Sequence, residues 1–433
     1  MYDFNILISK GEKKVNKLKK IIASALIFTS IFSSAVFAAD NNTNEPDLIG
    51  TSAIAVDLDT DEIIYAKNID NKMFPASITK LMTALLLAEN KEPNDLLTYP
   101  KEALQEAPFS YGLNVHPVTP GDTFTASNAM NILLLYSGND VAYMIAKEVG
   151  GSVENFVKMM NEKAKELNMV NTHFVTPNGL DDNIDNHLTS SYDLSLLLKA
   201  VMANEWTSST MTKKEAEVKS TNGPAAKIEN RNKLVGENGN IGGKTGYTEK
   251  SGRCLATVYE RDGRKIAVVV LNSEYNLPQD TKVFEDVEKL ADFSYGAKKE
   301  PLLKKDTTLE TKTLKYNLIP FIGPERAVRV PVEIKDDASF YKTSLKADVS
   351  YDIKDVSAWK LNKNKSIGTV TVKVKDKETK FELYPTISKM ELVKNNIFIY
   401  LIILVVIVAL FILIVKLIKS SKNKKNKRRR LYR

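Results

Sequence analysis

The strongest constraint on how this chain folds is an uncharged apolar stretch at residues 397–415, which is long enough to cross a bilayer as one helix. Residues 416–433, which follow it, contain ten basic and no acidic side chains. Positive charge stays on the cytoplasmic side of a membrane span. The two signals predict a single-pass membrane protein with a folded body outside the cell membrane and a basic cytoplasmic tail at 416–433.

A second apolar run lies near the N-terminus, at residues 21–37, and lysines precede it. It ends in Val36-Phe37-Ala38, with small side chains at the two positions that a signal peptidase reads. This pattern predicts a signal peptide over residues 1–38 that is cut after Ala38. An uncleaved membrane anchor is the alternative. Residues 39–47 are polar and predict a flexible linker.

The charge of the body differs from the charge of its ends. Residues 39–395 contain 45 basic and 51 acidic side chains, so the basic character of the whole chain belongs to the targeting segments. The sequence therefore predicts no nucleic-acid partner. Cys254 is the only cysteine, which excludes an intramolecular disulfide. No cysteine or histidine pair has metal-ligand spacing, and we expect neither a metal nor a cofactor.

The first part of the body predicts an α+β domain over residues 48–298. Short apolar runs at 52–58 and 62–66 predict a hairpin, and strands at 253–260 and 264–271 flank an Asp262-Gly263 turn. Helical patterns lie between and after them, at 78–89, 126–136, 141–149, 153–167, 192–203 and 280–293. Strands from both ends of the region favour one antiparallel sheet flanked by helices, with an inserted helical subdomain.

The pattern changes from about residue 302, where short alternating runs recur at 307–314, 327–334, 343–351, 366–374 and 380–383. They predict a small all-β domain over 302–390, a sandwich or barrel. No chemical motif occurs in it, so we expect a spacer between the first domain and the membrane. The Pro-Glu-Arg segment at 324–326 receives no function from the sequence.

Ser77 and Lys80 form the first chemical motif. They lie three residues apart at the start of a predicted helix, so their side chains share one face of its first turn. A serine hydroxyl needs a base to become a nucleophile, and a neutral amine in a desolvated pocket can act as one. On its own, such a tetrapeptide also occurs by chance on surface helices.

The second motif, Ser137-Gly138-Asn139, lies where one helical pattern stops and the next begins. A tight turn there can direct two polar side chains into one cleft. Ser137 is then placed to relay a proton between Lys80 and a leaving amine, and Asn139 to bind a substrate amide. The same residue types are common in ordinary interhelical turns.

The third motif, Lys244-Thr245-Gly246, begins a predicted edge strand after two further glycines. Lys244 and Thr245 can hold a terminal carboxylate by charge and hydrogen bonding. An edge strand can also bind an extended peptide as an added strand. The alternative is a glycine-rich hairpin with an exposed lysine.

The order of these motifs resembles the S-x-x-K, S-x-N and K-T-G signature of penicillin-recognising serine acyltransferases. Longer blocks at 74–84, 137–142, 171–180 and 242–255 are similar to low-molecular-weight penicillin-binding proteins of the D-alanyl-D-alanine carboxypeptidase type. The resemblance covers about residues 49–296 and implies a β-lactamase/transpeptidase-like fold. It also implies a role in peptidoglycan and cell-wall biogenesis.

The resemblance further implies that the enzyme removes the terminal D-alanine from peptidoglycan stem pentapeptides, with Ser77 as nucleophile and Lys80 as general base. Ser137 would relay the proton, and the backbone N–H groups of Ser77 and Tyr247 would bind the oxyanion. β-Lactam antibiotics would acylate Ser77. The implied substrate-binding residues are Asn139, Lys244, Thr245, Gly246 and Tyr247.

Several alternatives remain open. A D,D-endopeptidase would use the same residues, and an anchored wall-binding or sensory protein would need none of the chemistry. A class A β-lactamase needs a Glu-x-x-Leu-Asn pattern, but Ala164 stands at the glutamate position. His173 and His187 are expected to order loops. No further basic residue for the carboxylate is identified near residues 272–274. Either Lys244 and Thr245 carry more of that binding, or another arginine substitutes.

Overall fold

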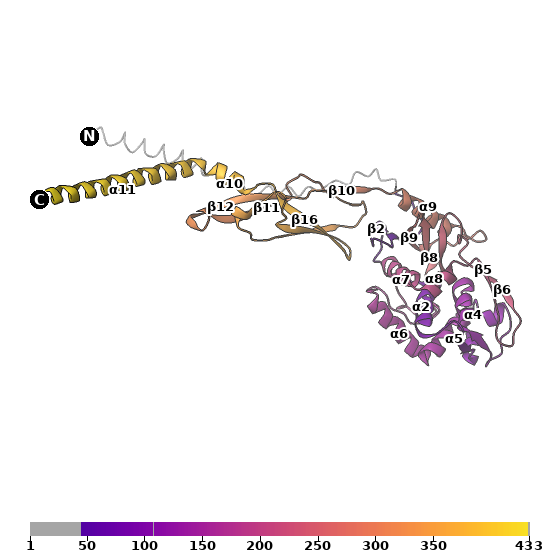
Figure 1. The fold of residues 1–433 in the computed structure, drawn as a ribbon. Helices are drawn as coiled ribbons and strands as arrows, with labels where there is room; N and C mark the ends of the chain where they lie inside the picture. Colours follow the sequence, from indigo (N-terminus) through magenta and orange to yellow (C-terminus); the bar gives the residue numbers. More distant parts are fainter. Residues whose placement is uncertain (1–44, 107, 432–433) are drawn as a thin grey trace, which may run out of the picture. The chain divides into compact units, whose positions relative to one another are not determined.

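The structure is a computed structural model that describes residues 45–106 and 108–431. The predicted signal peptide and its cleavage site at Ala38 lie outside the described residues. Within them the chain forms an α+β region, a β-rich region and a long C-terminal helix, which Figure 1 shows in sequence colours. This agrees with the predicted fold class, whereas the predicted domain boundaries stay predictions.

The centre of the α+β region is a five-stranded antiparallel sheet. Its strand order is β2-β1-β9-β8-β7, formed by β1 (Ser52–Asp57), β2 (Ile63–Lys67), β7 (Asn240–Thr248), β8 (Gly252–Arg261) and β9 (Arg264–Ser273). Both predicted hairpins are confirmed. Strand β7, which carries the third motif, lies at the edge of the sheet, as the sequence predicts.

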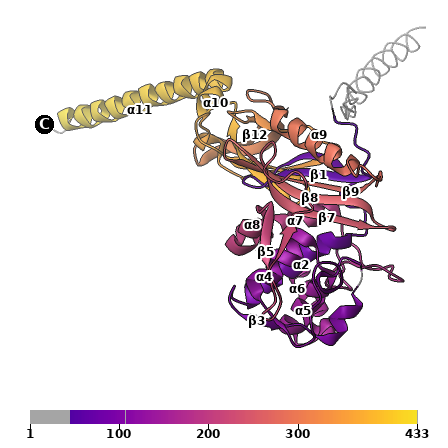
Figure 2. The same ribbon diagram turned by 90° about the vertical axis from the view of Figure 1, so that its right-hand side faces the viewer.

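The two faces of this sheet belong to two different apolar cores, because alternate side chains of a strand point to opposite faces. Ile54 and Val269 face a large core shared with helices α2 (Lys80–Asn90), α5 (Asn139–Gly150) and α7 (Ser191–Ala203). Ala53 and Val270 face a smaller core shared with α9 (Lys282–Gly296). Figure 2 shows α9 on one side of the sheet and α2 and α7 on the other.

The predicted helices are confirmed, with ends shifted by a few residues. They are η1 (Ala76–Thr79) with α2 (Lys80–Asn90), α4 (Ala126–Asn131), α5 (Asn139–Gly150), α6 (Val153–Glu166), α7 (Ser191–Ala203) and α9 (Lys282–Gly296). Helix α7 begins after Ser190, whose side chain accepts a hydrogen bond from the backbone N–H of Asp193.

Several short elements of the first region are absent from the sequence prediction. These are β3 (Leu96–Thr98), η2 (Lys101–Gln105), α3 (Tyr111–Asn114), β4 (Thr123–Thr125), α8 (Glu205–Met211), β5 (Glu215–Val218) and β6 (Ala226–Glu229). A further difference is that the helix expected over 126–136 ends in a wider π-helical turn, Ile132–Tyr136. Ser137 follows it with a left-handed backbone (φ 74°, ψ 35°). The wide turn therefore ends at the second motif, as such turns do at many functional sites.

The β-rich region contains a five-stranded antiparallel sheet with strand order β11-β12-β16-β15-β14. Its strands are β11 (Glu310–Ile319), β12 (Ile322–Glu333), β14 (Ala347–Ile353), β15 (Gly368–Val374) and β16 (Lys377–Pro385), and β10 (Lys299–Leu303) pairs separately with β13 (Ala338–Tyr341). Only two residue pairs join β12 to β16. Both halves nevertheless share one apolar core, to which Leu314, Val330 and Val370 contribute.

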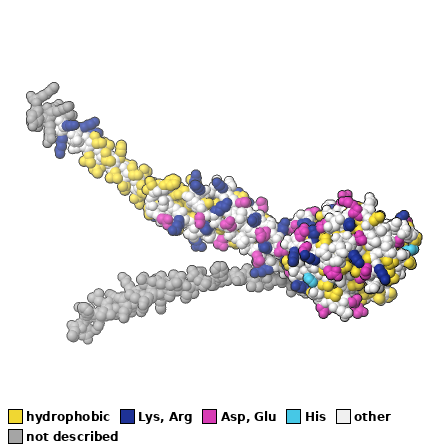
Figure 3. Space-filling view, turned by 90° about the horizontal axis from the view of Figure 1, so that it is seen from below, with side chains coloured by type: hydrophobic (Ala, Val, Ile, Leu, Met, Phe, Trp, Pro, Cys, Tyr) yellow, Lys and Arg dark blue, Asp and Glu magenta, His cyan; other side chains and the backbone are white. Residues whose placement is uncertain are grey.

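The C-terminal part consists of α10 (Lys389–Asn395), which follows the short η4 (Ala358–Lys360) and the last strand, and of α11 (Ile397–Leu431). In the part of the chain that the structure describes, α11 is the one helix long and apolar enough to cross a membrane, with a mean hydropathy of 3.6 in its most apolar window. No part of that window is buried by the rest of the described chain. In Figure 3 the hydrophobic side chains of α11 form a continuous yellow surface.

Candidate active site

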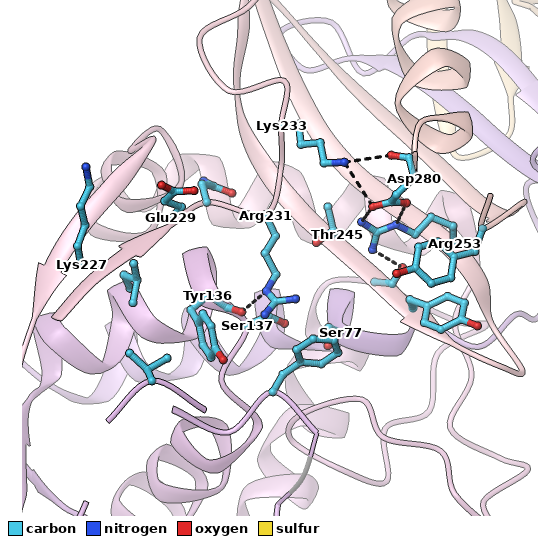
Figure 4. A pocket seen from close by; sticks show the side chains of 17 residues that line it. Ser77, Tyr136, Ser137, Lys227, Glu229, Arg231, Lys233, Thr245, Arg253 and Asp280 are labelled. Atoms are coloured by element: carbon cyan, nitrogen blue, oxygen red, sulfur yellow. Dashed lines mark hydrogen bonds and ion pairs between the residues drawn. The ribbon is translucent and has the colours of Figure 1, made fainter. Parts of the chain in front are cut away.

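The three motifs meet in one cleft of about 510 Å³ beside the edge strand β7. Ser77 enters it from η1, Ser137 from the turn before α5, and Thr245 with Gly246 from β7. Figure 4 shows Ser77, Ser137 and Thr245 from these separate elements around the same space. The fold thus brings together residues that lie far apart in the sequence.

Ser77 and Lys80 are in direct contact. Lys80 Nζ lies 2.9 Å from Ser77 Oγ, 2.7 Å from Asn139 Oδ1 and 2.7 Å from the carbonyl oxygen of Asn178. A neutral amine has two N–H groups and one lone pair. If the two carbonyl oxygens accept both N–H groups, the lone pair is left for the Ser77 hydroxyl.

The surroundings of Lys80 favour this neutral form. The side chain is completely buried, and burial lowers the pKa of its amine to about 7. The nearby Arg231 guanidinium lowers the pKa further, whereas Asp140 and Glu106 oppose the shift. Lys80 therefore loses its proton near neutral pH, which is where a general base is most effective.

The loop after α6 fixes one side of Lys80. It is held by Thr83 Oγ1, which donates to the Pro177 carbonyl at 2.6 Å. Gly179 has a positive φ of 86°, and a Cβ there would lie 1.9 Å from the Ala76 carbonyl oxygen. Only glycine permits this approach, which places the Asn178 carbonyl against the amine of Lys80.

His187 supports the same loop. Its Nδ1 accepts hydrogen bonds from the backbone N–H groups of Val175 and Thr176, and its Nε2 contacts Thr79 Oγ1 at 2.9 Å. Burial lowers the pKa of its imidazole to about 3. His173 Nδ1 is bonded to the Asn186 carbonyl. Both histidines order loops, as the sequence suggests.

Ser137 forms a second serine–lysine pair with Lys244. Lys244 Nζ donates to Ser137 Oγ and to the Thr245 carbonyl, at 2.9 Å in each case. The Lys244 side chain is buried, and burial together with the charge of Lys80 lowers the pKa of its amine well below its usual range. The site therefore contains two serine–lysine pairs, Ser77 with Lys80 and Ser137 with Lys244, and both lysine amines are buried.

Asn139 connects the second motif to the first. Its Oδ1 accepts from Lys80, and its Nδ2 donates to the Pro108 carbonyl at 2.5 Å. The amide therefore positions Lys80, and its contact with a substrate stays a prediction. The adjacent Asp140 is fully buried and accepts from Tyr99 Oη and from the backbone N–H groups of Tyr111 and Gly112.

Strand β7 approaches the nucleophile closely because it contains Gly246. A Cβ at this position would lie 3.0 Å from the Pro75 carbonyl oxygen and 3.3 Å from the backbone nitrogen of Ser77. Tyr247, the next residue, is 37 % exposed and packs its ring against Tyr275 with 4.3 Å between the centroids. Thr245, Gly246 and Tyr247 thus line the cleft, whereas Lys244 is buried behind it and reaches it only through Ser137. The roles of these residues stay predictions.

Arg231 is a site residue that the sequence reasoning missed. Its guanidinium lies between the rings of Phe109 and Tyr136, at 4.1 and 4.8 Å from their centroids, and Nε donates to the Tyr136 carbonyl. Among the described residues it forms no ion pair. Arg231 lies just after β6, and the β5–β6 hairpin that places it has strands of only four residues each, which give a weak strand signal in the sequence. The Asn-Arg-Asn sequence at 230–232 is an insufficient signal.

The sequence also does not reveal four further charged residues of the site. Arg253 donates from Nε and Nη2 to the two carboxylate oxygens of Asp280 at 2.8 and 2.7 Å, and Lys233 lies 3.8 Å from the same carboxylate. Figure 4 shows this group beside Thr245. Glu106 accepts from Asn178 Nδ2 at 2.7 Å, and burial raises the pKa of its carboxyl group. Arg253 is thus a basic neighbour of β7, but its charge is balanced by Asp280.

Comparison with known proteins agrees with this geometry. The family described as D-alanyl-D-alanine carboxypeptidase, Peptidase_S11, matches residues 39–275. The chain belongs to this family. Over 390 residues it is 27% identical to the D-alanyl-D-alanine carboxypeptidase DacF of Bacillus subtilis (strain 168), covering 89% of this chain and 97% of DacF.

Two solved structures support the fold of this carboxypeptidase family member. The D-alanyl-D-alanine carboxypeptidase of Mycobacterium tuberculosis H37Rv superimposes with a TM-score of 0.55 at 27% identity, covering 60% of this chain and 96% of that one. Penicillin-binding protein D2 of Listeria monocytogenes, in its ampicillin-bound form, gives a TM-score of 0.51 at 28% identity, over 58% and 100% of the two chains.

Proposed function

We propose that this family member is a serine-type D-Ala-D-Ala carboxypeptidase that trims peptidoglycan stem pentapeptides. The observation that carries the proposal is the placement of a buried amine with a pKa of about 7 at 2.9 Å from the Ser77 hydroxyl, in a cleft beside a free sheet edge. Carboxypeptidases among its relatives support the substrate class.

In the acylation step, Ser77 Oγ attacks the carbonyl carbon of the penultimate D-alanine as Lys80 takes the hydroxyl proton. The C–N bond then breaks, and the proton passes from Lys80 through Ser137 to the leaving D-alanine amine. Lys244 holds Ser137 by a 2.9 Å hydrogen bond and so orients this relay. A water molecule then attacks the ester carbonyl carbon and gives a proton to Lys80. The bond between that carbon and Ser77 Oγ breaks, Lys80 returns the proton to Ser77 Oγ, and the trimmed peptide leaves with a new terminal carboxyl group.

The oxyanion of the tetrahedral intermediate requires donors that are already in place. We assign this role to the backbone N–H groups of Ser77 and Tyr247. The close approach of Gly246 to the Ser77 backbone supports the assignment, because it brings the two segments together without side chains between them.

The terminal carboxylate of the substrate needs a cation that is not already neutralised. Arg253 is paired with Asp280, whereas Arg231 lines the same cleft and forms no ion pair among the described residues. We therefore assign the carboxylate to Arg231 together with Lys244 and Thr245 of β7. A guanidinium can form two parallel hydrogen bonds with a carboxylate, which favours this choice.

We further propose that α11 anchors the enzyme in the cell membrane, with the catalytic region outside and the basic tail inside. The apolar length of α11 and the positive charge after it support this orientation. β-Lactam antibiotics would acylate Ser77, since they present a strained carbonyl to the same nucleophile. The ampicillin-bound relative supports this proposal.

The test is intact mass spectrometry of the full chain in detergent during incubation with benzylpenicillin. We expect a lasting one-to-one adduct that is absent from Ser77→Ala. Turnover of a pentapeptide and of a cross-linked dimer then separates carboxypeptidase from endopeptidase activity. Rapid penicillin hydrolysis without an adduct would favour a β-lactamase, and the absence of both adduct and hydrolysis would favour the wall-binding or sensory alternative.

A further inference from the structure

The turn between β11 and β12 presents an apolar tip. Pairing of the two strands continues to Ile319 and Ile322, so that only Pro320 and Phe321 form the turn. Phe321 is 95 % exposed, Ile322 70 % and Ile319 41 %. A cluster of large apolar side chains in water is unfavourable, and such clusters mark contact surfaces for a protein or a membrane.

The strand that leads to this tip is bonded to the start of α11. The side-chain amide of Asn396 donates to Tyr316 Oη at 3.0 Å, and Tyr400 Oη donates to the Leu318 carbonyl at 2.8 Å. The two contacts lie two residues apart along β11 and four residues apart from Asn396, which directly precedes α11, to Tyr400 within it. Strand and helix therefore run in the same direction.

The spacing of the two contacts indicates that the segments run side by side. Two strand residues span about 6.6 Å and four helical residues span about 6 Å. The tip lies beyond Leu318, and so projects from the end of the β-rich region at which α11 begins. In Figure 1 the β11–β12 hairpin and α11 extend toward the same side of the β-rich region.

We propose that the tip formed by Ile319, Pro320, Phe321 and Ile322 is a second membrane contact, which inserts into the lipid bilayer beside α11. This inference rests on the proposed spanning role of α11. The occupant is lipid because the tip lies beyond Leu318, at the end of β11 that is bonded to the start of the helix that enters the membrane. In Figure 3 the hydrophobic surface continues from α11 onto the adjoining end of the β-rich region.

The backbone and charges of the hairpin are suited to this position. Buried backbone N–H and C=O groups must be paired in lipid, and the strand pairing leaves a turn of two residues, of which Pro320 has no N–H. Glu325 pairs with Lys315 at 2.9 Å, and Arg326 donates to Asn396 Oδ1 at 3.1 Å. These charged groups lie before the tip, at the level of the lipid headgroups. The Pro-Glu-Arg segment at 324–326 thereby acquires a role as the polar collar of the insertion.

The test places a polarity-sensitive fluorophore on single introduced cysteines in the full chain, reconstituted into phosphatidylglycerol–phosphatidylethanolamine vesicles. The variants are Phe321→Cys at the tip, Leu404→Cys in α11 and Lys346→Cys as the water-exposed control. The Lys346 side chain is 90 % exposed. Ser344, two residues before it, contacts Ala66 of the α+β region, so this control lies on the side of the β-rich region that faces the α+β region. Cys254 is buried, and burial raises the pKa of its thiol to about 11, so it does not compete for the label.

We expect aqueous iodide to quench the Phe321 probe several-fold less than the Lys346 probe, and lipid-attached nitroxide to quench it several-fold more. If the Leu404 probe is lipid-embedded but the Phe321 probe behaves like the Lys346 probe, the tip inference is overturned and the anchor stands. If iodide reaches the Leu404 probe, both the proposed membrane span of α11 and the proposed insertion of the tip are wrong. Protection of the Phe321 probe from both quenchers would indicate a protein contact and also overturn the inference. Penicillin acylation of each variant verifies its fold.

Discussion

At the level of single residues, the proposed acylation depends on the protonation state of Lys80. Burial lowers the pKa of this amine to about 7, and only the neutral amine can accept the Ser77 proton. The rate of acylation by benzylpenicillin should therefore rise with pH through a midpoint near 7 and then level off. Stopped-flow or quenched mass spectrometry across the pH range measures this profile. A rate that is flat from pH 6 to about 9 would contradict Lys80 as the base.

Two neighbouring charges should move this midpoint in opposite directions. The charge of Arg231 lowers the pKa of Lys80 and that of Glu106 raises it, so Arg231→Gln should shift the acylation profile to higher pH and Glu106→Gln to lower pH. If Arg231 only binds the substrate carboxylate, Arg231→Gln would weaken peptide turnover but would leave the midpoint of the acylation profile unchanged. Shifts of both variants in one direction would refute the electrostatic account.

The residues that sequence alone could identify are those fixed by local spacing. Ser77 and Lys80 lie on one turn, and their contact follows from the three-residue separation. Arg231 and Glu106 come from loops that reach the cleft only after distant segments pack, so no local pattern could place them. The expectation that the three motifs meet predicted the cleft. The charged residues around the cleft are brought there by tertiary packing, so the sequence could not reveal them.

Among the elements, the loop at 177–181 is the most sensitive to a small change. In Gly179→Ala the new Cβ would lie 1.9 Å from the Ala76 carbonyl oxygen, at a φ of 86° that alanine adopts only with strain. The backbone strain alone costs on the order of 1–3 kcal/mol, and the clash adds to it. We expect a lower Tm and a loss of acylation of tenfold or more, since the Asn178 carbonyl must leave Lys80.

A matched control exists at Gly296, at the end of α9. A Cβ there meets no atom within 4 Å, and its φ is ordinary. Gly296→Ala should leave both the Tm and the acylation rate close to those of the parent chain. Calorimetry and the penicillin assay compare the two variants, and equal behaviour would show that the tight contact at Gly179 is unimportant.

Long periodic elements were predictable and short or irregular ones were not. Helix α7 has a clear apolar period and a serine cap, and the structure has it within one residue of the predicted start. The π-turn at Ile132–Tyr136 has the same apolar composition as an α-helix, so the sequence could not reveal it. The β5–β6 hairpin has strands of only four residues each, which alternate polar and apolar side chains, and Val218 and Ile228 pack into the large core.

For the whole molecule, apolar burial should dominate membrane attachment. The most apolar window of α11 has a mean hydropathy of 3.6, whereas the basic tail at 416–433 would add a salt-dependent attraction. The full chain should therefore stay with membranes after high-salt and carbonate washes, as detected by sedimentation. A chain truncated before Ile397 should be released, and one shortened only after residue 421 should remain. Release of the full chain by salt would show electrostatic, peripheral attachment.

The edge position of β7 has a consequence for which cell walls this enzyme can process. A peptide that pairs with a strand edge is held through its main chain, and main-chain hydrogen bonding does not distinguish one side chain from another. Selectivity would then come from the chirality and free carboxylate of the last residue. Stem peptides with lysine or diaminopimelate at the third position should be trimmed at similar rates, and an L-alanine terminus should not be cleaved. A single enzyme could thus serve walls that differ in their cross-linking chemistry.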